Sequence, residues 1–319
     1  MKLAFIVDPL SKLNPGHDTT VALMEAAQLL GHQVFVTGIE HLTVIDSKAW
    51  AQLQSVAIVP VVETEGAWVC PQQDWYCLSE SELVCLEEMD AVFMRIDPPV
   101  TIQYLYATYI LELIDRNYTQ VINSPQGLRE ANEKMYALQF SSAMPETIVS
   151  SDKQVIRAFV KKHKAAVLKP LGGKAGEGIL FLESDDRNFN SLLEISTKQG
   201  QEPVMIQRYL EDAKAGDKRI ILFKGQAIGA VNRVPTGQEF RGNMAVGGRV
   251  EKTEITAREN EICRLIEPKL VQDGLYLVGI DIIGGYLTEV NVTSPTGIRE
   301  IDLLDKTSLG KRIISCLEK

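Results

Sequence analysis

A short segment near the carboxy terminus constrains the fold more than any other part of the chain. Residues 278–299, VGIDIIGGYLTEVNVTSPTGIR, contain two apolar runs of strand character on either side of a glycine pair, which is the pattern of a β-hairpin. Three residues of this hairpin carry carboxylate or amide oxygens: Asp281 before the turn, and Glu289 and Asn291 after it. Whether these oxygens can act together depends on the length of the turn.

Two turn lengths fit this hairpin. A two-residue turn at Gly284-Gly285 would place Asp281 on the face opposite the other two oxygen-bearing residues. A three-residue turn that ends at Tyr286 would place Asp281 across from Glu289 and bring all three side chains to one face, because side chains alternate along a strand. We predict the three-residue turn.

An aspartate, a glutamate and an asparagine on one face form a hard oxygen site. Proteins usually bind Mg²⁺ through one or two carboxylates together with substrate phosphates, so the predicted metal ligands are Asp281, Glu289 and Asn291. The alternative is a solvated hairpin edge that carries ordinary surface charges. The three residues alone do not separate these interpretations, and the rest of the chain has to decide between them.

The chain as a whole has the composition of a globular protein with several domains. Its 319 residues exceed the usual size of a single domain. The net charge of −9 argues against a nucleic-acid partner or an anionic membrane surface, since both are bound mainly through excess lysine and arginine. No apolar run reaches the roughly 18 residues of a membrane span. The five cysteines lack CxxC spacing, which favours a cytoplasmic protein with reduced thiols.

The amino-terminal part has the pattern of a parallel sheet. A strand at 3–7, a helix at 19–30 with Asp18 as its N-cap, and a strand at 33–37 form a β-α-β unit. The loop after the first strand has no GxGxxG, so a dinucleotide site is not expected there. We place the end of this first unit near residue 123.

The second unit, residues 124–203, carries two lysines in positions of interest. A predicted helix at 126–140 contains Lys134, and a predicted strand ends at Lys169. The segment 172–178 then holds four glycines in seven residues and leads into another strand. A strand, a glycine-rich turn and a strand form a flap rather than a Walker loop, and backbone N–H groups in such a flap can approach phosphate oxygens. A plain flexible hairpin is the alternative.

The third unit, residues 204–319, combines strands with arginines. Strands are predicted at 204–210, 217–223 and 226–233, and the segment 234–248 has the character of a lid loop, with a simple surface excursion as the alternative. Arginines can bind phosphate and carboxylate groups in a bidentate way. Five of them lie on or near the elements around the hairpin: Arg219, Arg233, Arg241, Arg249 and Arg299.

The order of these features resembles that of the ATP-grasp ligases, and more narrowly that of the bacterial-type glutathione synthetases. The matching motifs span nearly the whole chain and include the amino-terminal unit, which differs between ATP-grasp subfamilies. They are VDP at 7–9, MRIDPP at 94–99, YATYILE at 106–112, NSPQGLREANEK at 123–134, LKPLGG at 168–173, GDKRIIL at 216–222, RGNMAVGGR at 241–249 and GIDIIGGYLTEVNVTSPTGIRE at 279–300.

The resemblance implies an α/β ATP-grasp fold in three parts. A Rossmann-like substrate domain with a parallel sheet would occupy residues 1–123. A small central ATP-grasp subdomain with the glycine-rich flap would occupy residues 124–203. A carboxy-terminal ATP-grasp subdomain with the lid loop and the metal site would occupy residues 204–319. ATP would lie between the last two parts.

The resemblance also implies roles for single residues. Arg219 and Arg233 match arginines near the transferred phosphoryl group. The positions that match residues around the dipeptide substrate are Arg241, Ser294 and Thr296. The positions that match nucleotide-binding residues are Lys134, Lys169, Gly172, Gly173, Gly176, Gln207, Tyr209, Leu210 and Asp217.

Two positions depart from the family pattern. The flap reads GGKAGEG, where relatives commonly have a denser run of small residues, which leaves its phosphate contacts open. His17 precedes Asp18 where relatives tend to have a lysine, and a histidine could replace that lysine only partly at neutral pH.

The implied activity is the ATP-dependent ligation of γ-glutamylcysteine with glycine through an acyl phosphate, which yields glutathione, ADP and phosphate. The implied metal is Mg²⁺, with Mn²⁺ as an alternative. The resemblance further suggests a homo-oligomer, with a tetramer as the expected state. Two other functions remain open at this stage: a different ATP-grasp carboxylate–amine ligase, and a non-catalytic ATP-binding regulator.

Overall fold

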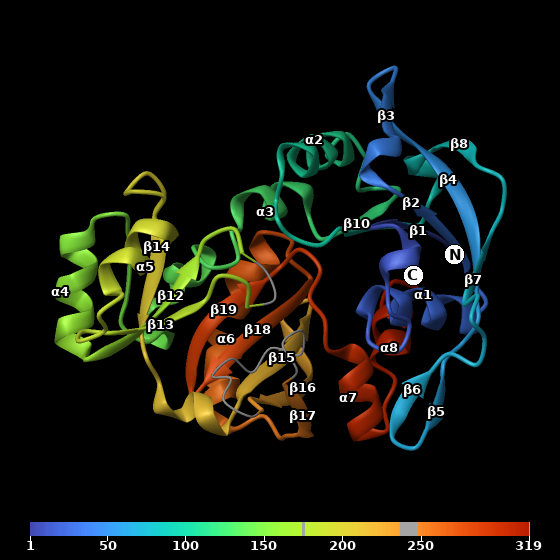
Figure 1. The fold of residues 1–319 in the computed structure, drawn as a ribbon. Coiled ribbons are helices and arrows are strands. Elements are labelled where there is room, and N and C mark those ends of the chain that lie inside the picture. The colour runs from blue at the N-terminus through green and yellow to red at the C-terminus, as the bar shows by residue number, and fades with distance from the viewer. Residues whose placement is uncertain (174–175, 237–247, 319) are drawn as a thin grey trace.

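The computed structural model of the chain describes residues 1–173, 176–236 and 248–318. Three sheets lie in a row in Figure 1, with the amino-terminal sheet at one end, the central sheet at the other, and the carboxy-terminal sheet between them. None of the described helices has the length and apolar character needed to cross a bilayer. Arg241 and most of the predicted lid loop lie outside the described residues.

The amino-terminal sheet is parallel in one half and antiparallel in the other. Four strands in the order β10-β9-β1-β2 are parallel, as the β-α-β pattern predicts, and β4 adds to β2 in the antiparallel sense. A small hairpin, β5 (Val62–Thr64) and β6 (Ala67–Val69), stands apart. The strands of the sheet are β1 (Lys2–Val7), β2 (Gln33–Thr37), β3 (Leu42–Ile45), β4 (Lys48–Ile58), β7 (Tyr76–Leu78), β8 (Glu82–Cys85), β9 (Ala91–Arg95) and β10 (Gln120–Ile122).

Helices from both ends of the chain cover this sheet. Helix α1 (Thr19–Leu29) begins at Asp18, whose carboxylate accepts the N–H groups of Thr20 and Val21, as expected of an N-cap. Helix α2 (Ile102–Leu111) is capped by the hydroxyl of Thr101. The last helices, α7 (Ile298–Asp305) and α8 (Leu309–Ser315), return to contact α1, so the carboxy terminus packs on the amino-terminal domain (Figure 1).

The central sheet is antiparallel, in the order β11-β14-β12-β13. Its strands are β11 (Thr147–Ser150), β12 (Ala165–Pro170), β13 (Leu180–Glu183) and β14 (Val204–Arg208), and its helices are α4 (Lys153–His163) and α5 (Phe189–Ser196). They enclose a hydrophobic core of their own. Strand β14 pairs inside this sheet, although the sequence division at residue 203 assigned it to the carboxy-terminal unit.

The carboxy-terminal sheet is antiparallel, in the order β17-β16-β15-β18-β19, with β19 at one edge. Helix α6 (Ala257–Gln272) packs near it and begins with a capping box between Thr256 and Glu259. The strands are β15 (Asp217–Phe223), β16 (Gln226–Val234), β17 (Arg249–Lys252), β18 (Leu277–Ile283) and β19 (Tyr286–Asn291). Short 3₁₀ helices occur at Leu10–Lys12, Ile39–His41, Leu86–Glu88, Tyr136–Ala143 and Glu211–Ala215.

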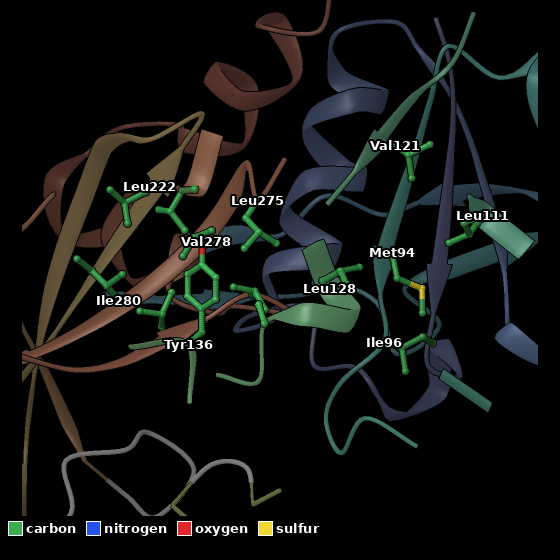
Figure 2. Packing of buried hydrophobic residues seen from close by; sticks show 14 of the residues in the cluster. Met94, Ile96, Leu111, Val121, Leu128, Tyr136, Leu222, Leu275, Val278 and Ile280 are labelled. Atoms are coloured by element: carbon green, nitrogen blue, oxygen red, sulfur yellow. The ribbon is translucent and has the colours of Figure 1, made fainter. Parts of the chain in front are cut away.

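One hydrophobic core joins the amino-terminal and carboxy-terminal sheets (Figure 2). Met94 belongs to the first sheet and Val278 and Ile280 to the second, while Leu128 and Tyr136 lie on the connecting segment between them. All five side chains are at most 3% exposed. The two sheets are therefore held together as one packed body, and the segment around residues 123–136 lies at their junction.

The predicted helix at 126–140 is wrong in its second half. Helix α3 (Pro125–Glu130) begins at Ser124 but ends after one and a half turns. The side-chain oxygen of Asn132 accepts the N–H groups of Lys134 and Met135, at 3.2 and 3.0 Å. An asparagine that bonds to nearby backbone N–H groups offers the chain a turn in place of a helix. Lys134 therefore lies on a turn.

Candidate active site

The hairpin of β18 and β19 has the two-residue turn, so the three-residue prediction is wrong. Gly284 and Gly285 have φ values of 55° and 77°, in the left-handed region that tight hairpin turns require, and Ile283 pairs with Tyr286. The register then shifts, because Ile282 pairs with Leu287 and the next pair is Asp281 with Glu289. The shift is a β-bulge with Thr288 as the extra residue.

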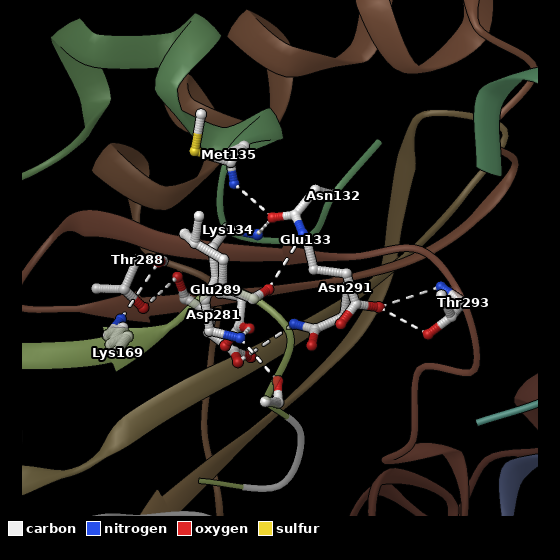
Figure 3. A network of polar contacts seen from close by, with 12 residues as sticks. Asn132, Glu133, Lys134, Met135, Lys169, Asp281, Thr288, Glu289, Asn291 and Thr293 are labelled. Atoms are coloured by element: carbon white, nitrogen blue, oxygen red, sulfur yellow. Dashed lines mark hydrogen bonds and ion pairs between the residues drawn. The ribbon is translucent and has the colours of Figure 1, made fainter. Parts of the chain in front are cut away.

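The bulge produces the arrangement that was predicted from the three-residue turn, with the three side chains on one face. Asp281 lies across from Glu289, and Asn291 follows two residues later on the same face, with its Nδ2 donating to Asp281 Oδ2 at 3.3 Å. The bulged Thr288 has a further consequence: its carbonyl oxygen accepts the ammonium of Lys169 at 3.4 Å (Figure 3). The bulge thus connects the metal-ligand candidates to the lysine at the end of β12.

Asp281 lies between two arginines. Arg219 contacts both of its oxygens, at 2.5 and 3.1 Å, and Arg233 contacts Oδ1 at 2.9 Å. All three side chains are at most 5% exposed. Burial alone would raise the pKa of Asp281, but Arg219 and Arg233 hold that pKa well below its usual range. The two arginines therefore keep Asp281 in its charged form.

Asp217 shares Arg233 with Asp281. Its Oδ2 accepts Arg233 Nη2 at 2.6 Å, while its Oδ1 is buried and has no hydrogen-bond partner among the described residues. Burial raises the pKa of Asp217 to about 6, against the opposing effect of Arg233. A buried acceptor without a donor is costly, and this oxygen could accept a hydrogen bond from a bound group.

Lys134 connects the hairpin to the flap. Its Nζ lies 3.0 Å from Glu289 Oε1 and donates to the carbonyl oxygen of Gly173 at 2.9 Å (Figure 3). Lys169 is also buried, and that burial lowers the pKa of its ammonium group, which the charge of Glu289 partly offsets. Both lysines therefore interact electrostatically with Glu289.

Two adjoining pockets meet at this cluster, and Ile179 and Glu289 line both of them. The first lies between the central and carboxy-terminal sheets, and the predicted residues that line it are Lys169, Gln207, Tyr209, Leu210, Asp217 and Asp281. The second reaches toward the amino-terminal domain, and the predicted residues that line it are Lys134, Gly173, Gly176, Arg219, Arg233, Asn291, Ser294 and Thr296. Gly172 is not among the residues that line either pocket.

The donor set fits a divalent cation that takes other ligands from a substrate. No group of three or more His, Cys, Asp or Glu residues arranged to hold a metal occurs in the part of the chain that the structure describes. The hairpin brings two carboxylates and one amide together, and both oxygens of Asp281 already accept hydrogen bonds from its neighbours. Asn291 Nδ2 donates to Gly279 O and Asp281 Oδ2, which leaves Asn291 Oδ1 as an available ligand. Such a set suits Mg²⁺ better than Zn²⁺, because Mg²⁺ completes its shell with phosphates and water.

Two of the five arginines do not belong to this site. Arg299 is buried in an ion pair with Glu25 of α1, at 2.7 Å, and its Nε donates to the carbonyl oxygen of Pro15. Arg249 is exposed and pairs with its neighbour Glu251. The sequence interpretation grouped these arginines by their distance along the chain, but Arg299 follows the hairpin on a helix that turns toward the amino-terminal domain.

The sequence interpretation missed three polar residues around the pocket: Arg95 and Asn123, which are buried, and Glu133, which is half-buried. Arg95 at the end of β9 donates to Thr20 and to the carbonyl oxygen of Pro295. Asn123 and Glu133 hold the backbone around β18 and β19, as the close-up of Glu133 in Figure 3 illustrates. Their residue types carry no periodic or spacing signal, and only the contacts across the junction identify them.

Comparison with known proteins shows the family to which the chain belongs. The family model of the prokaryotic glutathione synthetase N-terminal domain matches residues 1–129, and that of the prokaryotic glutathione synthetase ATP-grasp domain matches residues 133–306. The chain belongs to the prokaryotic glutathione synthetase family. Glutathione synthetases of Synechocystis sp. and Nostoc sp. are 67% and 63% identical to it over the whole of this chain and 99% and 98% of their own length.

Solved structures with low sequence identity share the ATP-grasp fold of this family. The ATP-grasp ligase PsnB in complex with a minimal precursor has a TM-score of 0.64 at 18% identity, and the match covers 98% of this chain and 97% of that one. The D-cycloserine synthetase DcsG has a TM-score of 0.63 at 14% identity, with coverages of 98% and 100%. The α/β ATP-grasp fold predicted from the sequence is thereby confirmed.

Proposed function

We propose that this protein ligates γ-glutamylcysteine with glycine at the expense of ATP, giving glutathione, ADP and phosphate. The single observation that carries the proposal is the meeting of two pockets at Glu289, one suited to a nucleotide and one suited to an anionic substrate. A phosphoryl group held at the hairpin would be within reach of both pockets. The high identity to named glutathione synthetases supports this choice of substrates.

The nucleotide would lie in the pocket lined by Gln207, Tyr209 and Leu210, with the adenine beside the strand end at residues 207–210. The unpartnered Oδ1 of Asp217 supports its assignment to a ribose hydroxyl. Lys134 and Lys169 would bind phosphate oxygens. The flap glycines would place backbone N–H groups over the phosphates, and Gly173, which contacts Lys134, is the best supported of them.

The proposed metal ligands are Asp281, Glu289 and the amide oxygen of Asn291. Mg²⁺ bound there would add positive charge next to the phosphate oxygens as their negative charge shifts during transfer. We propose Mn²⁺ as a substitute for Mg²⁺, because both ions accept the same oxygen ligands.

The chain itself would act by position and charge. The γ-phosphoryl group would pass to the carboxylate of γ-glutamylcysteine, and the glycine amine would then attack the acyl carbon while phosphate leaves. Arg219 and Arg233 line the substrate pocket beside the hairpin and would stabilise the transferred group. Ser294 and Thr296 line the same pocket and would contact the dipeptide, together with Arg241. This sequence of steps requires no nucleophile from the protein.

One assay tests the proposal. ADP release is measured with ATP, Mg²⁺, γ-glutamylcysteine and glycine, and each component is omitted in turn. We expect ADP release to require all four, and glutathione to appear in equal amount. Release that depends on a different acid and amine pair would identify another ligase of the ATP-grasp type. Tight ATP binding without any release would identify a regulator.

The assembly and location of the protein are further parts of the proposal. Membership in the family supports a cytoplasmic homo-oligomer, for which we propose a tetramer. Light scattering coupled to size-exclusion chromatography measures the mass directly. A monomer mass of 35.4 kDa in solution would contradict the proposed assembly.

A further inference from the structure

The segment that follows β19, residues 292–296, lines the substrate pocket. Four side chains from different parts of the chain hold it through hydrogen bonds to its backbone groups, and each of them comes from outside the hairpin. Such multiple anchoring suits a segment whose position matters for a bound substrate. Glu133 accepts the N–H groups of Val292 and Thr293. Three other side chains donate to carbonyl oxygens of the segment: Asn123 to Val292, Arg95 to Pro295 and Arg219 to Thr296.

Glu133 makes the largest contribution among these anchors. Its Oε1 accepts three hydrogen bonds: from Val292 N at 3.0 Å, from Thr293 N at 3.2 Å and from the Thr293 hydroxyl at 2.8 Å (Figure 3). Its own backbone carbonyl accepts Val290 N at 3.1 Å. One residue therefore holds the chain both before and after Asn291.

The position of β19 in the sheet explains why it needs this support. β19 is an edge strand, so the N–H groups on its outer side have no neighbouring strand to accept them. Val290 and Val292 lie two residues apart and both donate to Glu133, once to its carbonyl and once to its carboxylate. Glu133 thus takes the place of a strand at this edge. Next to it, Lys134 contacts Glu289.

A carboxylate is a costly choice for such a contact. Burial, with a further contribution from Glu289, raises the pKa of Glu133 above its ordinary value, so the environment resists the charged form. The three hydrogen bonds to one oxygen oppose this effect. Glu133 also lines the substrate pocket.

We propose that Glu133 is a positioning residue of the ligase site. By holding the outer edge of β19 on both sides of Asn291, it sets the direction of the Asn291 side chain and the path of the substrate-facing segment 292–296. This inference rests on the function proposed above and adds to it a residue that touches neither the metal nor the nucleotide.

Two variants of Glu133 and one control test the inference. Glu133→Ala removes all three side-chain hydrogen bonds, whereas Glu133→Gln retains an oxygen that can accept them. The control, Tyr136→Phe, removes a hydrogen bond from the Tyr136 hydroxyl to Asp273 at 2.8 Å, a few residues along the chain and away from the pocket. For each protein we would measure Tm, kcat, the KM values, ADP affinity in EDTA, and hydrogen exchange of the amides at 290–296.

We expect kcat of Glu133→Ala to fall about 100-fold, the loss typical of a small displacement of reacting groups. The Mg²⁺ concentration for half-maximal rate should rise, while ADP affinity in EDTA should stay within about twofold of wild type, because the nucleotide pocket has other walls. Exchange at 290–296 should accelerate. Glu133→Gln should recover a rate within about tenfold of wild type, since the hydrogen bonds to Oε1 can persist. Tyr136→Phe should lower Tm without changing kcat.

Several results would overturn the inference. Wild-type kcat in Glu133→Ala would do so, as would unchanged exchange at 290–296. A rate as low in Glu133→Gln as in Glu133→Ala would indicate that the charge rather than the anchoring matters. If Glu133→Ala does not fold, the exchange and kinetics of Glu133→Gln still decide, since loss of rate without faster exchange contradicts positioning. A wild-type protein without ADP release would instead refute the proposed function.

Discussion

Replacing Asp281 with asparagine should lower both turnover and folding stability, whereas replacing Glu289 with glutamine should lower turnover alone. Both changes remove one carboxylate from the proposed metal site. They differ in what surrounds the carboxylate: Asp281 is 3% exposed between Arg219 and Arg233, whereas Glu289 pairs with Lys134 at the wall of two open pockets. The pair of variants therefore compares a proposed metal ligand that is also the partner of two buried arginines with a proposed metal ligand that is not.

The size of the stability loss follows from the contacts of the two arginines. Removing one partner of a buried ion pair costs roughly 3–5 kcal/mol. Arg233 retains Asp217 at 2.6 Å, so most of the loss falls on Arg219, whose next contact is the carbonyl of Thr296 at 3.1 Å. We therefore expect Asp281→Asn to lower the free energy of unfolding by about 3 kcal/mol, the lower end of that range. At about 2–4 °C per kcal/mol, Tm should fall by roughly 6–12 °C. In Glu289→Gln, water in the open pocket can solvate Lys134. We therefore expect this variant to lower the free energy of unfolding by less than about 1 kcal/mol.

Thermal unfolding followed by circular dichroism and the coupled ADP assay together check this prediction. Both variants should lose at least about 100-fold in turnover, because each lacks a ligand of the ion that balances the phosphate charge. Equal Tm values for Asp281→Asn and wild type would refute the role of Asp281 as partner of the buried arginines. Unchanged turnover in Glu289→Gln would refute the metal assignment.

Three further changes test other parts of the structure. Burial raises the pKa of Asp302 from 3.8 to about 6. The folded state then binds more protons than the unfolded chain between these values, so stability falls as pH rises through this window, by at most about 3 kcal/mol. Asp302→Asn should remove that fall, and equal pH slopes of Tm in variant and wild type would contradict it. Asn123→Ala removes four hydrogen bonds of 2.8 Å between the junction and the carboxy-terminal sheet. It should lower the free energy of unfolding, measured in urea, by more than about 3 kcal/mol. A loss below about 1 kcal/mol would show that water replaces these hydrogen bonds. Lys169→Met should raise the KM for ATP at least about tenfold and leave the KM for glycine unchanged, so equal changes in both would argue against a phosphate contact.

Local signals in the sequence predicted much of the fold. The strands Gln33–Thr37 and Asp217–Phe223 have the predicted limits, and the helix that begins after Asp18 has the capping contacts expected of an aspartate. These features depend on residues within a few positions of one another, so the order of residues is enough to define them. The predicted helix through Lys134 is wrong because of another local interaction. The Asn132 side chain accepts the N–H groups of Lys134 and Met135 and so favours a turn over a helix.

The candidate site was predictable as a set of residue types but not as an arrangement. The lysines, the arginines at 219 and 233 and the oxygen ligands were identified along the chain and converge in space. Arg299 was grouped with them and instead pairs with Glu25, 274 residues away in the sequence. Long-range partners of this kind depend on how the sheets and helices pack, and no spacing in the sequence encodes that packing.

The hairpin of β18 and β19 separates the two kinds of information. The sequence by itself determined that a turn would include Gly284 and Gly285 and that Asp281, Glu289 and Asn291 would flank it, but it did not determine the length of that turn, which was predicted one residue too long. Only the tertiary structure decided that these side chains share a face. It does so through the bulge at Thr288, which faces Lys169, and through Glu133, which supports the open edge of β19. A bulge or an edge contact is stabilised by groups far away in the chain, and for that physical reason it becomes visible only in the folded molecule.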